Sequence, residues 1–295
     1  MHDATIRLRP TPPFDLSASL RFLGRFPATE GEQFVDDTHL VKALREGGLT
    51  VLVRLSSRGT IEEPDVACEL VADEPITEPA IAAVSDRLRF WLGLDDDVAE
   101  LYLRADEVFA TVVRRLYGYH QVKFPSPLEN VCWAILAQRA PRRVAQAAKR
   151  RLIECFDNHV ELDGTGYRAF PDLAQLRSLT DARLAELVRN DRKSTYLRGA
   201  FESLAQVDEQ FLRSGPYDDV KSYLLSIPGI GPWSASFVLI RGLGRTDEMP
   251  FDKEGATAAS RVYGRELTEG EFVDLASRYG PWQGYWGHYL RAVTG

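Results

Sequence analysis

The feature that most constrains this chain is a proline- and glycine-rich segment, Ile227-Pro228-Gly229-Ile230-Gly231-Pro232. Pro228 ends any helix that precedes it, because proline lacks the N–H group and disfavours helical geometry in the residue before it. Apolar residues at helical spacing predict that preceding helix over residues 219–226. Pro232 suits the first position of a following helix, which we expect to run to about residue 241. The segment therefore predicts two helices joined by a tight glycine turn, with Ile230 inserted into the core beneath it.

The same turn is suited to bind an anion. Glycine lets another group approach the backbone closely, and N–H groups at a turn beside a helix start form a site for an anion such as a phosphate. Asp252 follows further along the chain, after Met249-Pro250-Phe251. It suits the N-cap of a helix predicted over residues 254–262, and a cap can also be a catalytic carboxylate. The two features together suggest chemistry on a nucleic acid, whereas the glycine turn alone also fits an ordinary packed corner.

These residues resemble the helix–hairpin–helix DNA glycosylase superfamily, whose members carry this turn followed by a Pro-x-Asp. The chain is most similar to the branch of 3-methyladenine DNA glycosylase II. The resemblance extends in order over nearly the whole chain, through Pro12-Pro13-Phe14-Asp15, Phe124-Pro125-Ser126-Pro127, Arg192-Lys193-Ser194-Thr195-Tyr196-Leu197 and Pro281-Trp282-Gln283-Gly284-Tyr285.

The expected fold class is α+β, with a small antiparallel N-terminal sheet and helices followed by a mostly α-helical, two-lobed glycosylase domain. We expect a mixed domain over 1–115, a central helical domain over 116–225, and the hairpin with the C-terminal helices over 226–295, with the catalytic cleft between the helical lobes. Sequence periodicity predicts strands over 6–9, 34–41, 50–55 and 66–71. It predicts helices over 15–23, 78–92, 98–116, 128–156, 173–189, 194–212, 254–262, 269–278 and 281–293, and a surface loop over 158–170.

The resemblance implies an enzyme that flips a damaged nucleotide out of the duplex and hydrolyses its glycosidic bond, because a base inside the stack cannot be reached. Asp252 is the predicted catalytic residue, since bond cleavage builds positive charge on the sugar that a carboxylate stabilises. Trp233 stands where bifunctional members carry a nucleophilic lysine, so we expect a monofunctional glycosylase without AP lyase activity. A cationic base leaves readily, which favours alkylated bases such as 3-methyladenine, in base excision repair.

Two alternatives stay open. Arg139, Lys253 and Arg291 stand where the family's residues are usually apolar or aromatic, which admits a glycosylase for a deaminated or oxidised base. A non-catalytic lesion-binding protein is the other alternative, and Asp252 argues against it because a pure binder needs no carboxylate facing DNA phosphates.

The resemblance also assigns the remaining site residues. The substrate pocket is predicted from the aromatic side chains of Trp233, Phe237, Phe14 and Trp286. The DNA-binding residues are predicted to be Gln138, Arg139, Arg142, Gly229, Ile230, Gly231 and Ser234. No cofactor is required, although a structural Na⁺ or K⁺ ion is expected on the backbone carbonyls of Leu225, Ile227 and Ile230.

The net charge of −7 is at first sight unfavourable for DNA binding, but the charge is unevenly distributed. Residues 1–110 carry 11 Lys and Arg against 21 Asp and Glu, whereas the remainder carries 25 against 22. The expected partner is double-stranded DNA with a damaged base, bound by a monomer. No apolar run approaches the length of a membrane span and no N-terminal targeting pattern is seen, so a cytoplasmic location is expected.

Overall fold

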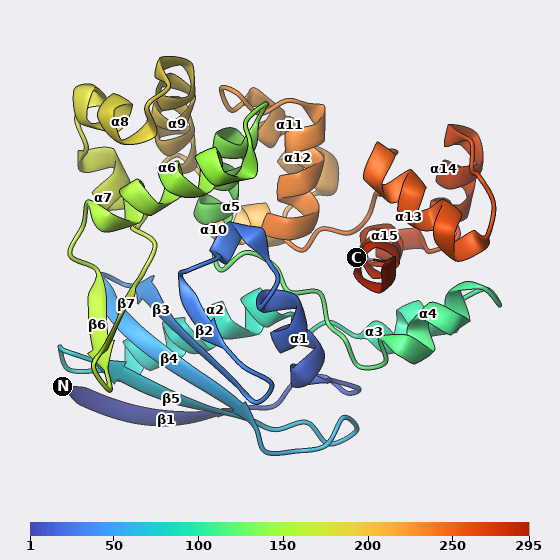
Figure 1. Cartoon of the computed structure of the whole chain (residues 1–295), viewed down its shortest axis with the longest axis horizontal. Helices are drawn as coiled ribbons and strands as arrows, with labels where there is room; N and C mark the ends of the chain where they lie inside the picture. The colour runs from blue at the N-terminus through green and yellow to red at the C-terminus, as the bar shows by residue number, and fades with distance from the viewer. Residues whose placement is uncertain (295) are drawn as a thin grey trace.

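The computed structural model describes residues 1–294 and places an antiparallel sheet beside two groups of helices (Figure 1). This arrangement confirms the predicted α+β class. The sheet has the strand order β1-β5-β4-β3-β2, so β1 and β2 form its edges. The strands run over β1 (His2–Leu8), β2 (Gln33–Val35), β3 (His39–Glu46), β4 (Leu49–Ser57) and β5 (Val66–Ala72).

One predicted strand, over residues 34–41, is divided in the structure into β2 and β3. The division is made by Asp36, whose Oδ1 accepts hydrogen bonds from the N–H groups of Thr38 and His39, both at 2.7 Å. A carboxylate that bonds backbone groups two and three residues ahead forms a turn, and the chain reverses there. The strand-like pattern of side chains is found on both sides of the turn, so the sequence predicted one continuous strand.

The helices flank the sheet and fill the rest of the molecule. Their bounds are α1 (Leu16–Leu23), α2 (Glu78–Leu92), α3 (Val98–Leu103), α4 (Phe109–Arg115), α5 (Pro127–Ala137), α6 (Arg142–Glu154), α7 (Leu173–Ser178), α8 (Asp181–Val188), α9 (Asp191–Leu204), α10 (Glu209–Ser214), α11 (Tyr217–Ser226), α12 (Pro232–Phe237), α13 (Lys253–Tyr263), α14 (Glu269–Ser277) and α15 (Gln283–Thr294). A single π-helical turn, Val238–Gly242, continues α12. No helix within residues 1–294 is long and apolar enough to cross a bilayer.

Four of the predicted long helices are each two helices in the structure. Polar residues start the second helix of three pairs: Asp106 accepts the N–H of Phe109 before α4, Thr180 caps α8, and Asp208 caps α10. Such side chains satisfy the free N–H groups of a new helix start. In the fourth pair, α5 and α6 are separated at Arg139, which takes a left-handed φ of 46°.

The predicted surface loop over residues 158–170 contains a β-hairpin, formed by β6 (His159–Leu162) and β7 (Thr165–Arg168). Its turn is Asp163-Gly164, and both residues have positive φ, at 51° and 75°. An Asp-Gly pair of this kind is a characteristic two-residue hairpin turn. The dipeptide was visible in the sequence, but the strands that it joins are too short to show clear alternation.

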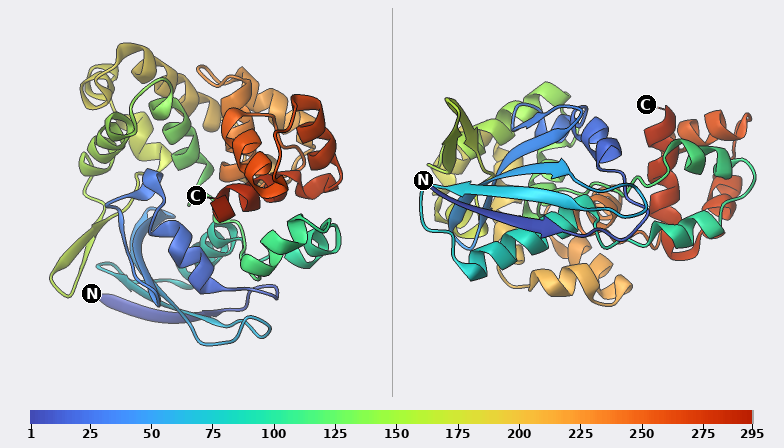
Figure 2. Two further views of the ribbon diagram at one scale, coloured as in Figure 1. Left: turned by 45° about the vertical axis from the view of Figure 1, so that its right-hand side comes forward. Right: turned by 90° about the horizontal axis from the view of Figure 1, so that it is seen from below.

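Hydrophobic packing forms two main cores. One joins the inner face of the sheet and α1–α4 to the C-terminal helices α13–α15, which lie beside α3 and α4 in both views of Figure 2. The other lies within the central helices and includes Ile227, Ile230 and Val238 of the hairpin. Apolar packing therefore unites the hairpin with the central helices, while Asp252 begins a helix of the other core.

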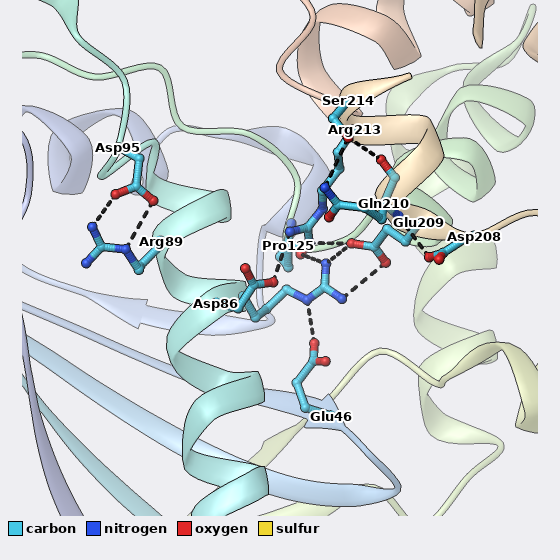
Figure 3. Close-up of polar contacts among 11 residues, drawn as sticks. Glu46, Asp86, Arg89, Asp95, Pro125, Asp208, Glu209, Gln210, Arg213 and Ser214 are labelled. Atoms are coloured by element: carbon cyan, nitrogen blue, oxygen red, sulfur yellow. Dashed lines mark hydrogen bonds and ion pairs between the residues drawn. The ribbon is translucent and has the colours of Figure 1, made fainter. Parts of the chain in front are cut away.

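A partly buried ion-pair network fastens the N-terminal sheet region to the central helices. Arg87 of α2 pairs with Glu46 of β3 and Glu209 of α10, with Nε 2.5 Å from Glu46 and Nη1 2.7 Å from Glu209. Figure 3 shows the two acidic side chains, Glu46 and Glu209, at opposite ends of this pair of contacts. Burial disfavours the charged guanidinium, but its bonds to Glu209 and Glu46 outweigh that cost and raise the pKa of Arg87. Arg87 also donates to the carbonyl of Pro125 at 3.2 Å, so this one side chain joins three segments distant in sequence.

Candidate active site

The predicted turn between two helices lies between α11 and α12. Gly229 has a φ of +84°, and a Cβ at this position would lie 2.5 Å from Cγ of Tyr196. Only glycine combines this left-handed backbone with so close a neighbour. Ile230 is 5% exposed and packs into the second core, as its predicted role beneath the turn requires.

Neither the backbone conformation nor the packing of Gly231 requires glycine at this position. Its φ of −94° and ψ of −180° are extended values that any residue adopts. Apart from its chain neighbours, no atom of residues 1–294 lies within 4 Å of a Cβ built at this position. The fold therefore does not require glycine here, whereas a ligand that approaches the backbone closely would require it.

The loop between α5 and α6 is attached to this turn. Nε2 of Gln138 donates to the carbonyl of Gly229 at 2.7 Å and to Oγ of Ser234 at 3.3 Å. The next residue, Arg139, is exposed and has a left-handed backbone. A left-handed conformation at a non-glycine residue is uncommon and here directs the chain out of α5. The structure thus brings together four predicted DNA-binding residues, Gln138, Arg139, Gly229 and Ser234.

A cleft of about 1,400 Å³ runs along this turn and the adjoining loops. Arg143, whose place beside Arg142 at a helix start also favours DNA contact, lines the cleft, whereas the predicted DNA-binding residue Arg142 does not. The cause is helical geometry, since adjacent residues at the start of α6 point to different sides. Sequence reasoning missed two more lining residues, Arg189 and Arg192, which lie in the α8–α9 connection and at the start of α9. The walls of the cleft therefore carry several cations.

Asp252 uses its two oxygens for two different partners. Oδ1 accepts the N–H of Gly255 at 2.6 Å and caps α13, as predicted. Oδ2 accepts a hydrogen bond from Nη2 of Arg291 at 2.6 Å, which forms an ion pair between side chains that are 20% and 33% exposed. The carboxylate is thus held in orientation and remains accessible from solvent.

A row of aromatic rings begins at the hairpin. Trp233 is 57% exposed and stacks on Phe237, with ring centroids 5.5 Å apart. The row continues edge-to-face through Phe124 and Phe26, at centroid distances of 5.9 and 5.2 Å. Phe22 follows in the row and stacks on Phe26 at 5.1 Å. Within this row Trp233 presents an exposed apolar face that suits an aromatic base, whereas Phe124 is fully buried.

The other two predicted pocket residues, Phe14 and Trp286, lie in the core. Phe14 is 3% exposed and packs edge-on against His120, and Trp286 is fully buried against Phe272. Phe22 of α1, in the same N-terminal segment as Phe14, is part-exposed. Sequence alone did not distinguish between the two rings, because Phe14 precedes α1 and is buried by tertiary contacts such as the one with His120.

Two polar side chains lie behind this row. The guanidinium of Arg241 stands 4.9 Å from the ring centroid of Phe22 and 5.2 Å from that of Phe26. It donates to the carbonyl of Val122 at 2.7 Å, and burial lowers its pKa to about 10. His288 contacts Nη1 of Arg241 through Nδ1 at 3.3 Å. Burial and the charges of Arg241 and Arg291 lower the pKa of His288 well below its ordinary value, so it is neutral near pH 7.

The carbonyls predicted to hold a monovalent cation lie on the hairpin, where Ile227 accepts the N–H of Ile230 at 3.0 Å. The cation itself stays a prediction. Within residues 1–294 no group of three or more His, Cys, Asp or Glu side chains is arranged to hold a metal ion.

No protein-family model matches this sequence. The chain is 26% identical over 288 residues to a DNA-3-methyladenine glycosylase of Bacillus subtilis, covering 95% of this chain and 94% of that protein. It is 27% identical over 226 residues to a probable bifunctional transcriptional activator/DNA repair enzyme AlkA of Mycobacterium tuberculosis, covering 75% of this chain and 44% of that longer protein.

Among solved structures, the 3-methyladenine DNA-glycosylase of Archaeoglobus fulgidus superposes with a TM-score of 0.77 at 22% identity, over 97% of both chains. An 8-oxoguanine glycosylase/lyase of Clostridium acetobutylicum, solved with double-stranded DNA, superposes with a TM-score of 0.70 at 16% identity, over 99% of this chain and 96% of that one. At these identities the likeness shows a shared fold.

Proposed function

We propose that this chain, which belongs to the helix–hairpin–helix DNA glycosylase superfamily, is a monofunctional glycosylase that hydrolyses damaged, in the first place alkylated, bases from double-stranded DNA. The observation that carries the proposal is the pair formed by an open glycine turn and an accessible carboxylate. Gly231 leaves room for a close ligand that the fold itself does not use, and Asp252 presents a fixed oxygen towards solvent.

The hairpin supplies the attachment to DNA. Its N–H groups at Gly229 and Gly231 suit one phosphate, and the cations along the cleft, Arg143, Arg189 and Arg192, suit others. Arg139 extends from the adjoining loop and is our candidate to fill the gap left by a flipped nucleotide, because a planar guanidinium stacks on bases. A Na⁺ or K⁺ ion on the hairpin carbonyls would add positive charge beside the same phosphate.

Asp252 supplies the chemistry. The bond between C1′ of the sugar and the base nitrogen breaks, and its electron pair leaves with the base. The oxygen of a water molecule then bonds to C1′ and releases one proton. For a base that was cationic this proton goes to solvent, whereas a base that was neutral takes up one proton and leaves in its neutral form. The carboxylate stabilises the positive charge that develops on the sugar between these events.

We propose hydrolysis without strand cleavage because the exposed Trp233 occupies the start of α12 and carries no amine. A lyase needs an amine nucleophile that forms a Schiff base with the sugar. One relative is named as a lyase: an N-glycosylase/DNA lyase of Saccharomyces cerevisiae is 28% identical over 130 residues, which are 40% of this chain and 35% of that protein.

Asp252→Asn tests the catalytic assignment. Asparagine is also a good N-cap, so the variant keeps the start of α13 and removes only the charge. We expect base release from DNA treated with a methylating agent to fall by at least about 100-fold. Binding to a duplex with an abasic-site analogue should stay within a few fold of the wild-type affinity. Retained turnover in the variant would exclude Asp252 as the catalytic group.

A further inference from the structure

The cleft beside the hairpin has a second wall, which is built from α6 and the α8–α9 connection. α8 packs against α6, whereas the hairpin helix α12 packs against α5. The loop between α5 and α6 therefore lies between the hairpin and α8, as Figure 1 shows. The loop is held by two bonds: Nζ of Lys193 donates to the carbonyl of Leu136 at 2.6 Å, and Gln138 donates to the carbonyl of Gly229. Arg139 thus stands between two separate surfaces.

The second wall is positively charged. Its cations include Arg143 and Arg151 on α6 and Arg189 at the C-cap of α8. Arg143, Ala147 and Arg151 follow one another at intervals of four residues, so they lie along one side of the helix. All of them line the cleft, and within residues 1–294 no Asp or Glu side chain lines it with them. The wall therefore presents a row of cations to the cleft.

The two exposed cations of this row are not neutralised by the protein. Other arginines of the same helical region lie 2.9, 2.6 and 2.8 Å from a carboxylate oxygen, namely Arg177, Arg183 and Arg198. Arg143 and Arg189 are exposed, and no ion pair joins either of them to a carboxylate in the part of the chain that the structure describes, residues 1–294. Their charges are thus available to an anionic ligand.

Arg151 and Arg189 meet at the end of α8. Nε of Arg151 donates to the carbonyl of Leu187, and Arg189 ends the helix with a left-handed backbone. Burial, and then the charge of Arg189, lower the pKa of Arg151, and Glu154 offsets only part of this effect. The dipole of α8 favours cations at its C-terminus, but the effect falls off within one turn. It does not explain Arg143, which lies eight residues and about 12 Å earlier along α6.

A row of unneutralised cations on a cleft wall suits the phosphates of a nucleic-acid strand. A side chain that fills a gap in a base stack enters from a groove, so one strand of the duplex lies on each side of it. With the damaged strand on the hairpin, the other strand lies on the second wall. We propose that Arg143, Arg151 and Arg189 bind the backbone of the undamaged strand opposite the damaged base. The inference rests on the proposed glycosylase function and names the second strand of its substrate as a bound part.

The test removes two charges of the row. Arg143→Gln combined with Arg189→Asn is the cleft variant, and asparagine is chosen because it tolerates the left-handed backbone at position 189. The matched control combines Arg115→Gln with Arg150→Gln. Both of these arginines are exposed and neither lines the cleft, so the control has the same net charge as the cleft variant.

Fluorescence anisotropy measures the affinity for one labelled oligonucleotide that contains an abasic-site analogue, alone and annealed to its complement. We expect the cleft variant to lose about tenfold or more in duplex affinity at about 0.1 M salt. The slope of log affinity against log salt concentration should become shallower by about two, one for each lost phosphate contact. The affinity of the cleft variant for the single strand, and of the control for the duplex, should stay within about threefold of wild type.

Arg143→Gln alone should give about half of the slope change, and it leaves the backbone at position 189 untouched. Equal losses for duplex and single strand would place these cations on the damaged strand and overturn the inference. An unchanged duplex affinity, or an equal loss in the control, would overturn it too. If the wild-type protein released no base from methylated duplex but kept the strand-dependent binding, the proposed catalysis would be wrong and this inference would stand.

Discussion

The two glycines of the hairpin turn are expected to be glycine for different reasons. The fold requires glycine at Gly229, whereas a bound ligand would require it at Gly231. Alanine at Gly229 has to adopt a left-handed backbone, at a cost of about 1–2 kcal/mol, because φ is +84°. Its Cβ also meets Tyr196 at 2.5 Å, and displacing a packed ring costs about 1–3 kcal/mol more. Alanine restricts the unfolded chain and recovers about 0.4–1 kcal/mol. We expect Gly229→Ala to lower the free energy of unfolding by about 1–4.5 kcal/mol.

Gly231→Ala is the matched substitution two residues away. Its backbone is extended and its Cβ meets no atom of residues 1–294 beyond its chain neighbours, so neither strain nor collision arises. Loss of a glycine N-cap and gain of backbone restriction nearly cancel, and we expect stability to change by no more than about 0.5 kcal/mol. The new methyl group would stand where a phosphate approaches the turn. Affinity for DNA should therefore fall by more than about tenfold.

Urea unfolding, followed by circular dichroism and tryptophan fluorescence, measures the first effect. The transition to follow is that of the central helices, because Ile227 and Ile230 of the turn belong to their core. Fluorescence anisotropy with a duplex that contains an abasic-site analogue measures the second effect. Equal destabilisation by the two substitutions, or wild-type DNA affinity in Gly231→Ala, would refute the assignment of Gly231 to a ligand.

Three further results are expected. Borohydride should trap no covalent adduct with DNA that contains the damaged base. A strong adduct would contradict the monofunctional proposal. The candidate nucleophile would then be Lys253, the lysine that follows the catalytic residue. Arg139→Ala should weaken binding to lesion-containing duplex by about tenfold while binding to undamaged duplex changes less. An unchanged affinity for the lesion-containing duplex would mean that another residue fills the gap left by the flipped nucleotide. Arg87→Met should lower the free energy of unfolding by about 3 kcal/mol in urea titrations, because it leaves the largely buried Glu46 without a cation, while Glu209 keeps its ion pair with Arg213. An unaffected midpoint would mean that this network contributes little.

The structure of the hairpin, and of the helix start that Asp252 caps, is determined largely by residues that are close together in the sequence. Pro228 and Pro232 end one helix and begin the next through their own backbone geometry, and Asp252 caps its helix through a bond to an N–H three residues ahead. Helix capping and proline geometry involve only neighbours in the sequence, so they do not depend on where the segment lies in the fold. The helix Glu78–Leu92 was predicted at its observed bounds for the same reason, since Thr77 caps its start and Gly93 ends it in a left-handed conformation.

Only the tertiary structure decided which side chains meet. Arg291 and Asp252 are separated by 39 positions and come together because α13 and α15 pack side by side. Phe14, a predicted pocket residue, is buried in the core because the chain packs it edge-on against His120, which is 106 positions away. Residue type and spacing set a helix or a turn through nearby backbone contacts. The charge of a pocket, in contrast, is a sum over segments that only the folded chain brings within a few ångströms of one another.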